Sequence, residues 1–126
     1  MLISNIDHLV ITVHDIEKTC SFYKMVMGLE TISFADGRMA IKVGDQKINL
    51  HKAGEELSPC AKYPTPGSAD LCFITPTSIS DYLHHLKNSG IDLEAGPVKR
   101  CGVYGEMDSV YFRDPDGNLL EVSHYL

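Results

Sequence analysis

The sequence lacks the features that mark several large classes of protein. Its four cysteines form no CxxC pair and no zinc-type spacing, which favours free thiols in a reducing compartment. It has no cluster of lysine and arginine, and its net charge of −6 argues against nucleic acid as a partner. No apolar run approaches the roughly 20 residues of a membrane span, and the first residues do not resemble a signal peptide. These absences predict a cytoplasmic protein with neither a membrane nor a nucleic acid as partner.

The composition is that of an ordinary globular domain. Hydrophobic residues make up 44% of the 126 positions and charged residues 22%. A chain of this length can bury a core without disulfide bonds, but half of it cannot easily do so alone. We therefore interpret the chain as a single domain over residues 1–126.

The first half of the sequence predicts one strand, one helix and three further strands. Residues 6–13 alternate between apolar and polar positions, which is typical of a strand with one buried face. Asp15 is a good helix N-cap, and Gly28 is a typical helix stop. The predicted apolar stripe of the helix consists of Ile16, Cys20, Tyr23 and Met27. The strands expected after it are Leu29–Phe34, Arg38–Val43 and Gln46–His51.

The second half repeats this pattern after a linker rich in proline and glycine. Ser78 is expected to cap a helix that ends at Gly90, with His84 and His85 on its solvated side. Gly-rich residues 96–105 are expected to form either a flexible connection or a lid that offers Arg100 to an anionic substrate. The helix stripe is predicted as Ile79, Leu83 and Leu86, and the strands as Ala69–Thr75, Ile91–Glu94, Ser109–Phe112 and Leu119–Ser123.

The spacing of equivalent positions supports an internal duplication. His8 and Asp70 are 70 − 8 = 62 residues apart, and Gly28 and Gly90 are 90 − 28 = 62 residues apart. The sequence therefore predicts an α+β fold made of two βαβββ repeats. We place the first repeat at about residues 4–53, the linker at 54–68 and the second repeat at about 69–126.

Two motifs at the ends of the chain resemble one known superfamily. Residues 6–10 (IDHLV), Phe22-Tyr23 and Gly28-Leu29 resemble the opening of vicinal oxygen chelate proteins, the glyoxalase/bleomycin resistance/dioxygenase superfamily. Residues 112–121 (FRDPDGNLLE) resemble their closing strand, and residues 45–51 (DQKINLH) resemble glyoxalase domain-containing protein 5 and bacterial virulence-protein relatives. The resemblance implies a single glyoxalase-like domain in which the two repeats form a cup-shaped mixed sheet with helices outside.

The resemblance also implies a metal centre and an assembly. It places metal positions at His8, Asn49, Asp70 and Glu121, with one divalent ion (Zn, Ni, Mn, Co or Fe) per site. Glyoxalase I has acidic or histidine ligands where this chain has Asn49 and Asp70, so the ligand set differs from that enzyme. Relatives are usually homodimers, and the same assembly is expected here.

His51 and Asp70 each have more than one possible role. His51 lies about 6.8 Å along its strand from Asn49, so the two cannot share one coordination site. His51 is a metal ligand, a catalytic base, a substrate contact or a structural residue. Asp70 is either a metal ligand or a carboxylate that orients one. The expected catalytic residues are Glu121 and His51, the substrate contacts Asn49, Arg100 and Tyr104, and the metal ligands His8, Glu121, Asp70 and His51.

Three functions remain open at the level of sequence. The first is a glyoxalase-type metalloenzyme, a lyase or isomerase that acts on a small substrate with adjacent oxygens. The second is an Fe(II) dioxygenase of the ring-cleavage type, with two histidines and one carboxylate as ligands. The third is a metal-free module that binds or sequesters a small molecule, which Asn49 in place of an acidic ligand favours.

Overall fold

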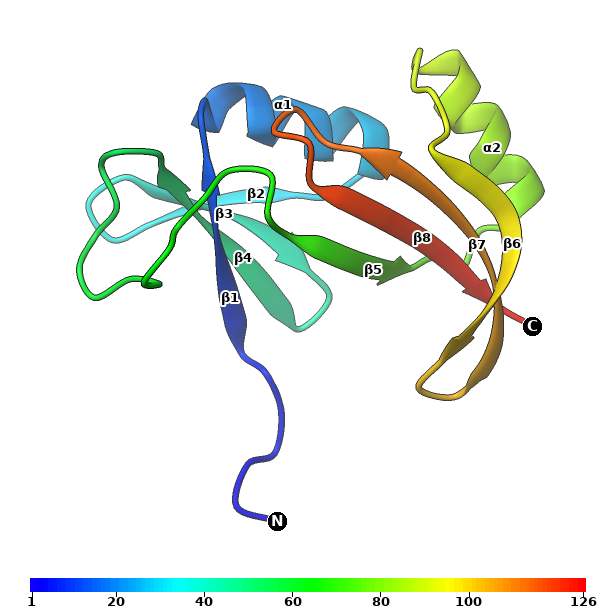
Figure 1. Ribbon diagram of the computed structural model, residues 1–126, viewed down its shortest axis with the longest axis horizontal. Coiled ribbons are helices and arrows are strands. Elements are labelled where there is room, and N and C mark those ends of the chain that lie inside the picture. The colour runs from blue at the N-terminus through cyan, green and yellow to red at the C-terminus, as the bar shows by residue number, and fades with distance from the viewer. The chain divides into compact units, whose positions relative to one another are not determined.

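The βαβββ order occurs twice along residues 1–126, all of which the computed structural model describes. The first half contains β1 (His8–Val13), α1 (Ile16–Met27), β2 (Thr31–Phe34), β3 (Arg38–Val43) and β4 (Gln46–Lys52). The second half contains β5 (Asp70–Ile74), α2 (Ile79–Asn88), β6 (Ala95–Gly102), β7 (Gly105–Arg113) and β8 (Leu119–Tyr125). The predicted duplication is therefore present in the secondary structure (Figure 1).

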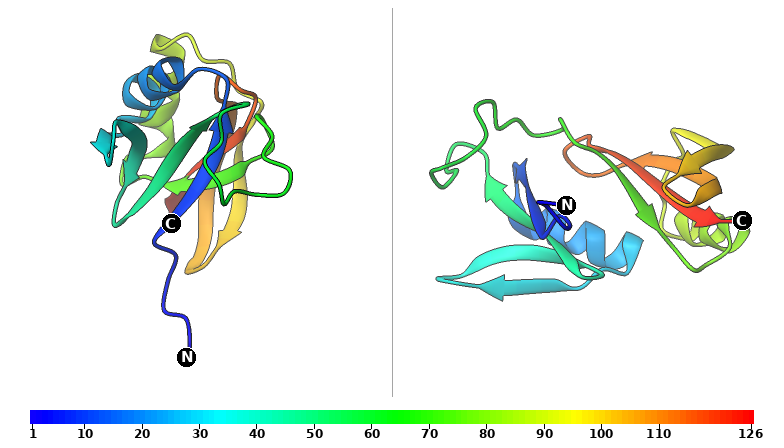
Figure 2. Two further views of the ribbon diagram at one scale, coloured as in Figure 1. Left: turned by 90° about the vertical axis from the view of Figure 1, so that its left-hand side faces the viewer. Right: turned by 90° about the horizontal axis from the view of Figure 1, so that it is seen from below.

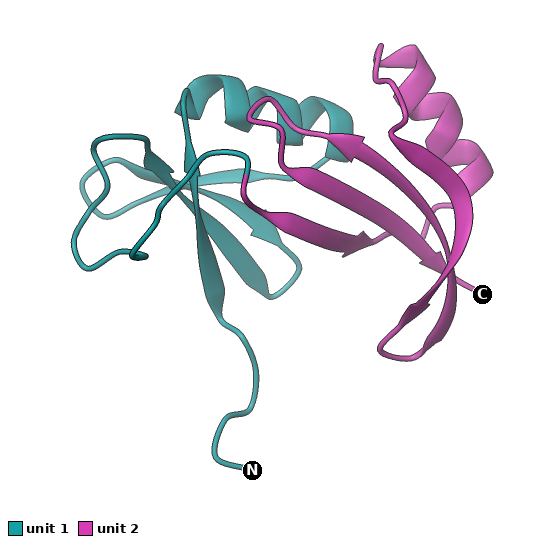
Figure 3. Cartoon of the chain, viewed as in Figure 1, with its two compact units in different colours: residues 1–67 teal, residues 68–126 magenta.

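The chain divides into two compact units, residues 1–67 (unit 1) and 68–126 (unit 2) (Figure 3). Each unit has its own four-stranded sheet, in the order β1-β4-β3-β2 in unit 1 and β5-β8-β7-β6 in unit 2. In each sheet the first and last strands of the repeat pair in parallel, and the other pairs are antiparallel. The α+β class and the two repeated modules are confirmed.

Helix α1 begins and ends where the sequence predicts, but it buries a different face. The Asp15 side chain accepts a hydrogen bond from the Lys18 backbone N–H, and Gly28 adopts φ +65° after the last turn. The helix covers one face of the unit 1 sheet (Figure 2). Its buried residues are Thr19, Tyr23 and Val26, whereas Ile16, Cys20 and Met27 of the predicted stripe are only half-buried. The buried face is thus centred on Tyr23 and its i−4 and i+3 neighbours.

Helix α2 packs in the same way on the unit 2 sheet. Ser78 accepts a hydrogen bond from the Asp81 backbone N–H. Ile79, Tyr82 and Leu86 are buried, so Tyr82 takes the place predicted for Leu83, which is half-buried. The Tyr82 ring centre lies 6.3 Å from that of Phe112 on β7. Burial raises the pKa of Tyr82 to about 12, because desolvation disfavours the phenolate.

The expected glycine-rich loop at residues 96–105 is a β-hairpin instead. β6 pairs with β7 from Ala95 to Gly102, and only Val103 and Tyr104 connect the two strands. The strand predicted at Ile91–Glu94 is absent, and β6 begins at Ala95. Glycine is required at position 102, because a Cβ there would overlap the Tyr125 hydroxyl and the Met107 sulfur. The glycines of this segment therefore serve close packing rather than flexibility.

Residues 54–68 contain neither helix nor strand, as predicted for the linker. The longest helix, α1, has 12 residues. No helix combines the length and the apolar character needed to cross a membrane.

The strand registers identify equivalent positions in the two sheets. Val10 of β1 lies opposite Asn49 of β4, and Cys72 of β5 lies opposite Glu121 of β8. Val10 and Cys72 are 72 − 10 = 62 residues apart, which is the spacing of the repeat. Asn49 and Glu121 therefore occupy the same position in the two units.

Candidate active site

Glu121 lies on the face of the unit 2 sheet that α2 does not cover, here called open face 2. Side chains alternate along β8, so Leu120 and Val122 point into the core while Glu121 points to the other face. Cys72 on β5 and Tyr111 on β7 are its cross-strand neighbours. The half-buried carboxylate is thus flanked by a thiol and a phenol.

A directed chain of hydroxyl groups ends at this carboxylate. Ser123 Oγ donates to Glu121 Oε2 over 3.1 Å, which uses its single proton. Ser109 Oγ lies 2.6 Å from Ser123 Oγ and must therefore be the donor of that bond. Both serines are fully buried. The chain of donors fixes the carboxylate of Glu121 in one orientation.

Tyr111 connects Glu121 to Arg100. Arg100 Nε donates to the Tyr111 hydroxyl over 2.9 Å, and the tyrosine is in turn hydrogen-bonded to Glu121. The pKa of Tyr111 is raised, first by desolvation and then by the charge of Glu121, while the bond from Arg100 acts in the opposite direction. Tyr111 is therefore a neutral donor to the carboxylate near neutral pH.

Cys72 is a third neutral group beside the carboxylate. Its Sγ lies 3.3 Å from Ser123 Oγ. The pKa of the Cys72 thiol is raised, mainly by burial and further by the neighbouring charges of Glu121 and Asp70. Glu121 forms no ion pair with any lysine, arginine or histidine. A half-buried carboxylate surrounded only by neutral groups is well suited to receive a cation.

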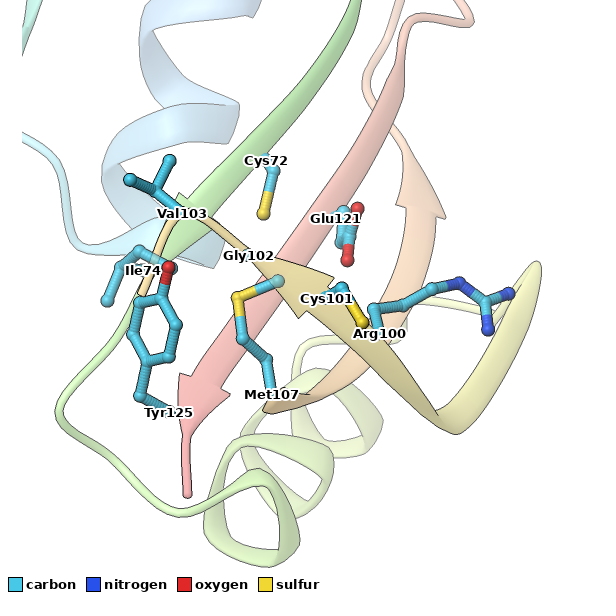
Figure 4. Close-up of a pocket in the computed structure, with 9 residues that line it drawn as sticks. All are labelled: Cys72, Ile74, Arg100, Cys101, Gly102, Val103, Met107, Glu121 and Tyr125. Carbon is cyan, nitrogen blue, oxygen red and sulfur yellow. The ribbon is translucent and has the colours of Figure 1, made fainter. Parts of the chain in front are cut away.

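Open face 2 is hollowed into a pocket of about 590 Å³. Figure 4 shows Glu121 and Cys72 in its middle, Arg100 at one end and a mostly apolar group at the other. The full lining is Cys72, Ile74, Arg100, Cys101, Gly102, Val103, Met107, Glu121 and Tyr125. The pocket combines one carboxylate, one guanidinium and an apolar wall, which suits a small polar molecule with an apolar portion.

The two predicted substrate contacts of unit 2 lie in different places. Arg100 lines the pocket, and bonds from Nε to Tyr111 and from NH1 to the Lys99 carbonyl hold its guanidinium. It has no carboxylate partner, so it keeps free N–H groups for an anion. Tyr104 lies at the tip of the β6–β7 hairpin, outside the pocket lining, and its N–H donates to the Tyr125 hydroxyl. Asp70 is exposed on open face 2 and also lies outside the lining.

Unit 1 carries the other predicted residues on the face of its sheet opposite α1, here called open face 1. His8, Asn49 and His51 all lie there, in register with Lys47, Val10 and Thr12 respectively. Asn49 is 4% exposed and His51 is 8% exposed, whereas the side chain of His8 is 45% exposed. Strand alternation thus places the three residues on one face, as expected.

His8 has the local arrangement of a metal-binding histidine. Its Nδ1 lies 2.8 Å from Oδ2 of Asp7, which leaves Nε2 as the nitrogen available to a ligand. Histidines that bind metals commonly donate their other ring N–H to a carboxylate in this way, which fixes the tautomer. Sequence reasoning did not single out Asp7, although its position directly before His8 was a usable signal.

His51 is buried but has no hydrogen bond to another side chain. The nearest charged group that senses it is Glu56. The pKa of Glu56 is lowered, mainly by bonds from the backbone N–H groups of Glu56 and Gly54 and to a lesser degree by His51. These contacts are compatible with each of the roles considered for His51.

The donor types fit a divalent ion, although the chain itself gathers no complete set of ligands. No group of three or more His, Cys, Asp or Glu side chains is arranged to hold a metal ion. The imidazole nitrogen of His8 and the carboxylate of Glu121 are each accessible on an open face and lack competing ligands. Nitrogen and carboxylate donors of this kind suit Zn²⁺ and the neighbouring transition metals. The ligand assignments to His8, Glu121, Asp70 and His51 stay predictions.

Comparison with known proteins identifies the family. A family model described as the Glyoxalase/Bleomycin resistance protein/Dioxygenase superfamily matches residues 5–122. The chain belongs to this superfamily. The resemblance drawn from the end motifs is therefore confirmed.

Several relatives match almost the whole chain. Virulence protein STM3117 of Salmonella typhimurium is 52% identical over 126 residues, which are 100% of this chain and 88% of the relative. Its crystal structure superposes with a TM-score of 0.96 over 100% of both chains. Glyoxalase domain-containing protein RDO1 of Mycosarcoma maydis is 50% identical over 123 residues, 98% of this chain and 69% of that protein. The predicted kinship with virulence proteins is confirmed.

More distant members of the superfamily include metal-dependent proteins. Metallothiol transferase FosB of Shouchella clausii is 27% identical over 96% of this chain and 80% of its own length. Lactoylglutathione lyase of Agrobacterium tumefaciens is 25% identical, with a TM-score of 0.73 over 96% of this chain and 93% of that chain. The fold is also shared by fosfomycin resistance protein FosX of Listeria monocytogenes, which was crystallised with Mn(II).

Proposed function

We propose that this protein is a metal-dependent enzyme of the glyoxalase type. It acts as a lyase or isomerase on a small substrate with two adjacent oxygens. The observation that carries the proposal is the pair Asp7–His8, in which the carboxylate holds Nδ1 and leaves Nε2 free for a divalent ion. The relationship to metallothiol transferase FosB and to lactoylglutathione lyase supports the same class of chemistry.

Each residue of the proposed site has one task. His8 and Glu121 hold the ion, with Asp70 as a further ligand or as a carboxylate that orients one. A bound divalent ion supplies Lewis-acid polarisation of the substrate oxygens. Arg100 binds an anionic group of the substrate, and Asn49 and Tyr104 are the further proposed contacts. Glu121 or His51 moves a proton between carbon and oxygen.

Metal titration of the purified protein without a histidine tag tests the proposal. We expect about one divalent ion per chain, with binding strongly weakened in His8→Ala and in Glu121→Ala. His84→Ala is the matched control, because His84 is an exposed histidine on α2 and should leave affinity unchanged. Parental affinity in both site variants contradicts the ligand assignment. Stoichiometric iron with oxygen uptake replaces the proposal by a dioxygenase, and no metal at all replaces it by a binding module.

His51→Ala separates the roles of this buried histidine. A ligand role predicts metal affinity lower by about 10–100-fold or more. A role as base predicts unchanged metal affinity and turnover lower by about 10²–10⁴-fold. A structural role predicts a lower melting temperature with unchanged metal content. We expect one of the first two results, because His51 shares open face 1 with His8 and Asn49.

A homodimer in the cytoplasm completes the proposal. In each sheet two strands have one unpaired edge, β1 and β2 in unit 1 and β5 and β6 in unit 2. Covering such edges by a second copy is a common solution. The four cysteines are all free, which fits a reducing compartment. A monomer mass in light scattering at micromolar concentration contradicts the dimer.

A further inference from the structure

Two cationic side chains of unit 1 share one aromatic ring. Lys47 Nζ lies 3.4 Å and Arg38 Cζ 4.8 Å from the ring centre of Phe34. Neither cation forms an ion pair with a carboxylate, although the chain has 17 acidic and only 11 basic residues. Both cations are therefore stabilised by the face of the ring and remain available to an anion.

The contact of Lys47 with Phe34 spans the sheet. Lys47 lies on β4 and Phe34 on β2, and β3 runs between these two strands. The lysine side chain therefore crosses β3 on open face 1, at about the level of Ala40. Ala40 is fully buried, and its small side chain leaves room for the aliphatic part of Lys47 to pass.

Beside this crossing lies a buried polar group without a partner. Asn49 is the cross-strand neighbour of Ala40 and is 4% exposed. Its Oδ1 is buried and accepts no hydrogen bond. A buried acceptor left unpaired is costly, and in native proteins it usually serves a purpose such as binding a ligand. Oδ1 is an acceptor, so the group that completes it must be a donor such as a hydroxyl.

We propose that open face 1 binds a small carboxylate that carries a hydroxyl on the adjacent carbon. Lys47 and Arg38 bind the carboxylate, and the hydroxyl donates its proton to Asn49 Oδ1. Phe34 holds both cations in place before the ligand arrives. The inference deepens the proposed function and rests on it for the link to catalysis, since it names the class of substrate or product. The binding itself involves no metal.

An NMR titration of the metal-free protein tests the inference. The two probes are lactate and propionate, which differ only in the hydroxyl on the carbon next to the carboxylate. We expect lactate to bind at least about 5-fold more tightly, the equivalent of one net hydrogen bond. The amide shifts should concentrate at residues 34–42 and 47–51. Equal affinity for the two probes, or shifts confined to unit 2, overturns the inference.

Three variants and one control assign the contacts. Lys47→Gln and Arg38→Gln should each weaken both probes, while Asn49→Ala should abolish the preference for lactate and leave propionate unchanged. Lys18→Gln removes an exposed lysine on α1 and should change neither affinity. An Asn49→Ala protein that keeps the preference overturns the role of Oδ1. If that variant does not fold, the comparison of the two probes in the parent protein still decides.

The same samples distinguish this inference from the proposed function. Lactate preference in a protein that binds no divalent ion supports the anion site and overturns the metalloenzyme. Metal binding through His8 and Glu121 without any lactate preference supports the metalloenzyme and overturns the anion site.

Discussion

The two units use the same backbone positions for opposite chemistry. Asn49 and Glu121 are equivalent in the two sheets, and so are Lys47 and Leu119, which pair with His8 and Asp70. On the helix-covered faces the corresponding residues stay apolar, with Ile48 and Leu50 in unit 1 and Leu120 and Val122 in unit 2. Core packing therefore constrained one face of each sheet, while the open faces diverged.

The neighbouring strand decides how each equivalent position is satisfied. Asn49 lies opposite Ala40, which offers no hydrogen bond, and its Oδ1 is unpaired. Glu121 lies opposite Tyr111, which donates to it, and Ser123 donates as well. Unit 2 has thus pre-oriented its acceptor with protein donors, whereas unit 1 leaves its acceptor to a ligand.

The largest difference in stability is expected at the turns before β4 and β8. Asp114 is buried, and its carboxylate accepts bonds from the N–H groups of Asp116 and Asn118 and from Asn118 Nδ2. Asp114→Ala should lower the free energy of unfolding by about 3 kcal/mol, since bonds to a charged group are worth about 1.5–3 kcal/mol each and are not additive. Urea denaturation measures the change.

Asp45 supplies the matched control in unit 1. It lies exposed in the turn before β4, where no such set of bonds exists. Asp45→Ala should change stability by no more than about 0.5 kcal/mol. Equal losses in the two variants would mean that the Asp114 network contributes nothing beyond a generic turn preference.

A smaller loss is expected inside the hydroxyl chain of unit 2. Ser109→Ala removes the donor to Ser123, and both side chains are fully buried. The free energy of unfolding should fall by about 1–2 kcal/mol, because a buried hydroxyl loses its partner. The matched variant Ser80→Ala, at an exposed position on α2, should be nearly neutral. A neutral Ser109→Ala would show that Ser123 is satisfied without it.

The sequence predicts the local part of this comparison well. Asp15, Gly28 and Ser78 carry the helix ends in their own chemistry, and Arg38–Val43 has the predicted bounds. Residues 95–105 were missed because Gly96, Pro97 and Gly102 hide the strand pattern. The reason for Gly102 is a contact with Tyr125, 23 residues away in sequence, which no local pattern contains.

The site divides in the same way between local and distant information. Strand parity places His8, Asn49 and His51 on one face, and residue chemistry singles out Glu121. The donors to Glu121 were not predicted, because they depend on the register between strands. Tyr111 reaches Glu121 only because the turn between β7 and β8 sets that pairing. Lys47 reaches Phe34 across an intervening strand, a contact that follows from the sheet order alone.

The smallest effect on stability is expected at Asn49 itself. Asn49→Leu replaces a buried amide, whose Oδ1 has no partner, by an apolar side chain of similar volume. The change in the free energy of unfolding should lie within about 0.5 kcal/mol of zero or favour the variant, because no bond is lost and an unpaired acceptor is removed. Urea denaturation beside Ser109→Ala gives the direct comparison.

This prediction separates a residue kept for stability from one kept for binding. If Asn49→Leu is as stable as the parent but has lost the preference for lactate, Asn49 costs folding energy that binding recovers. A loss of 2 kcal/mol or more, on the order of a buried hydrogen bond to a charged group, would place Asn49 in the structural network of unit 1. The equivalence with Glu121 would then be one of backbone position only, and the two open faces would differ in purpose as well as in charge.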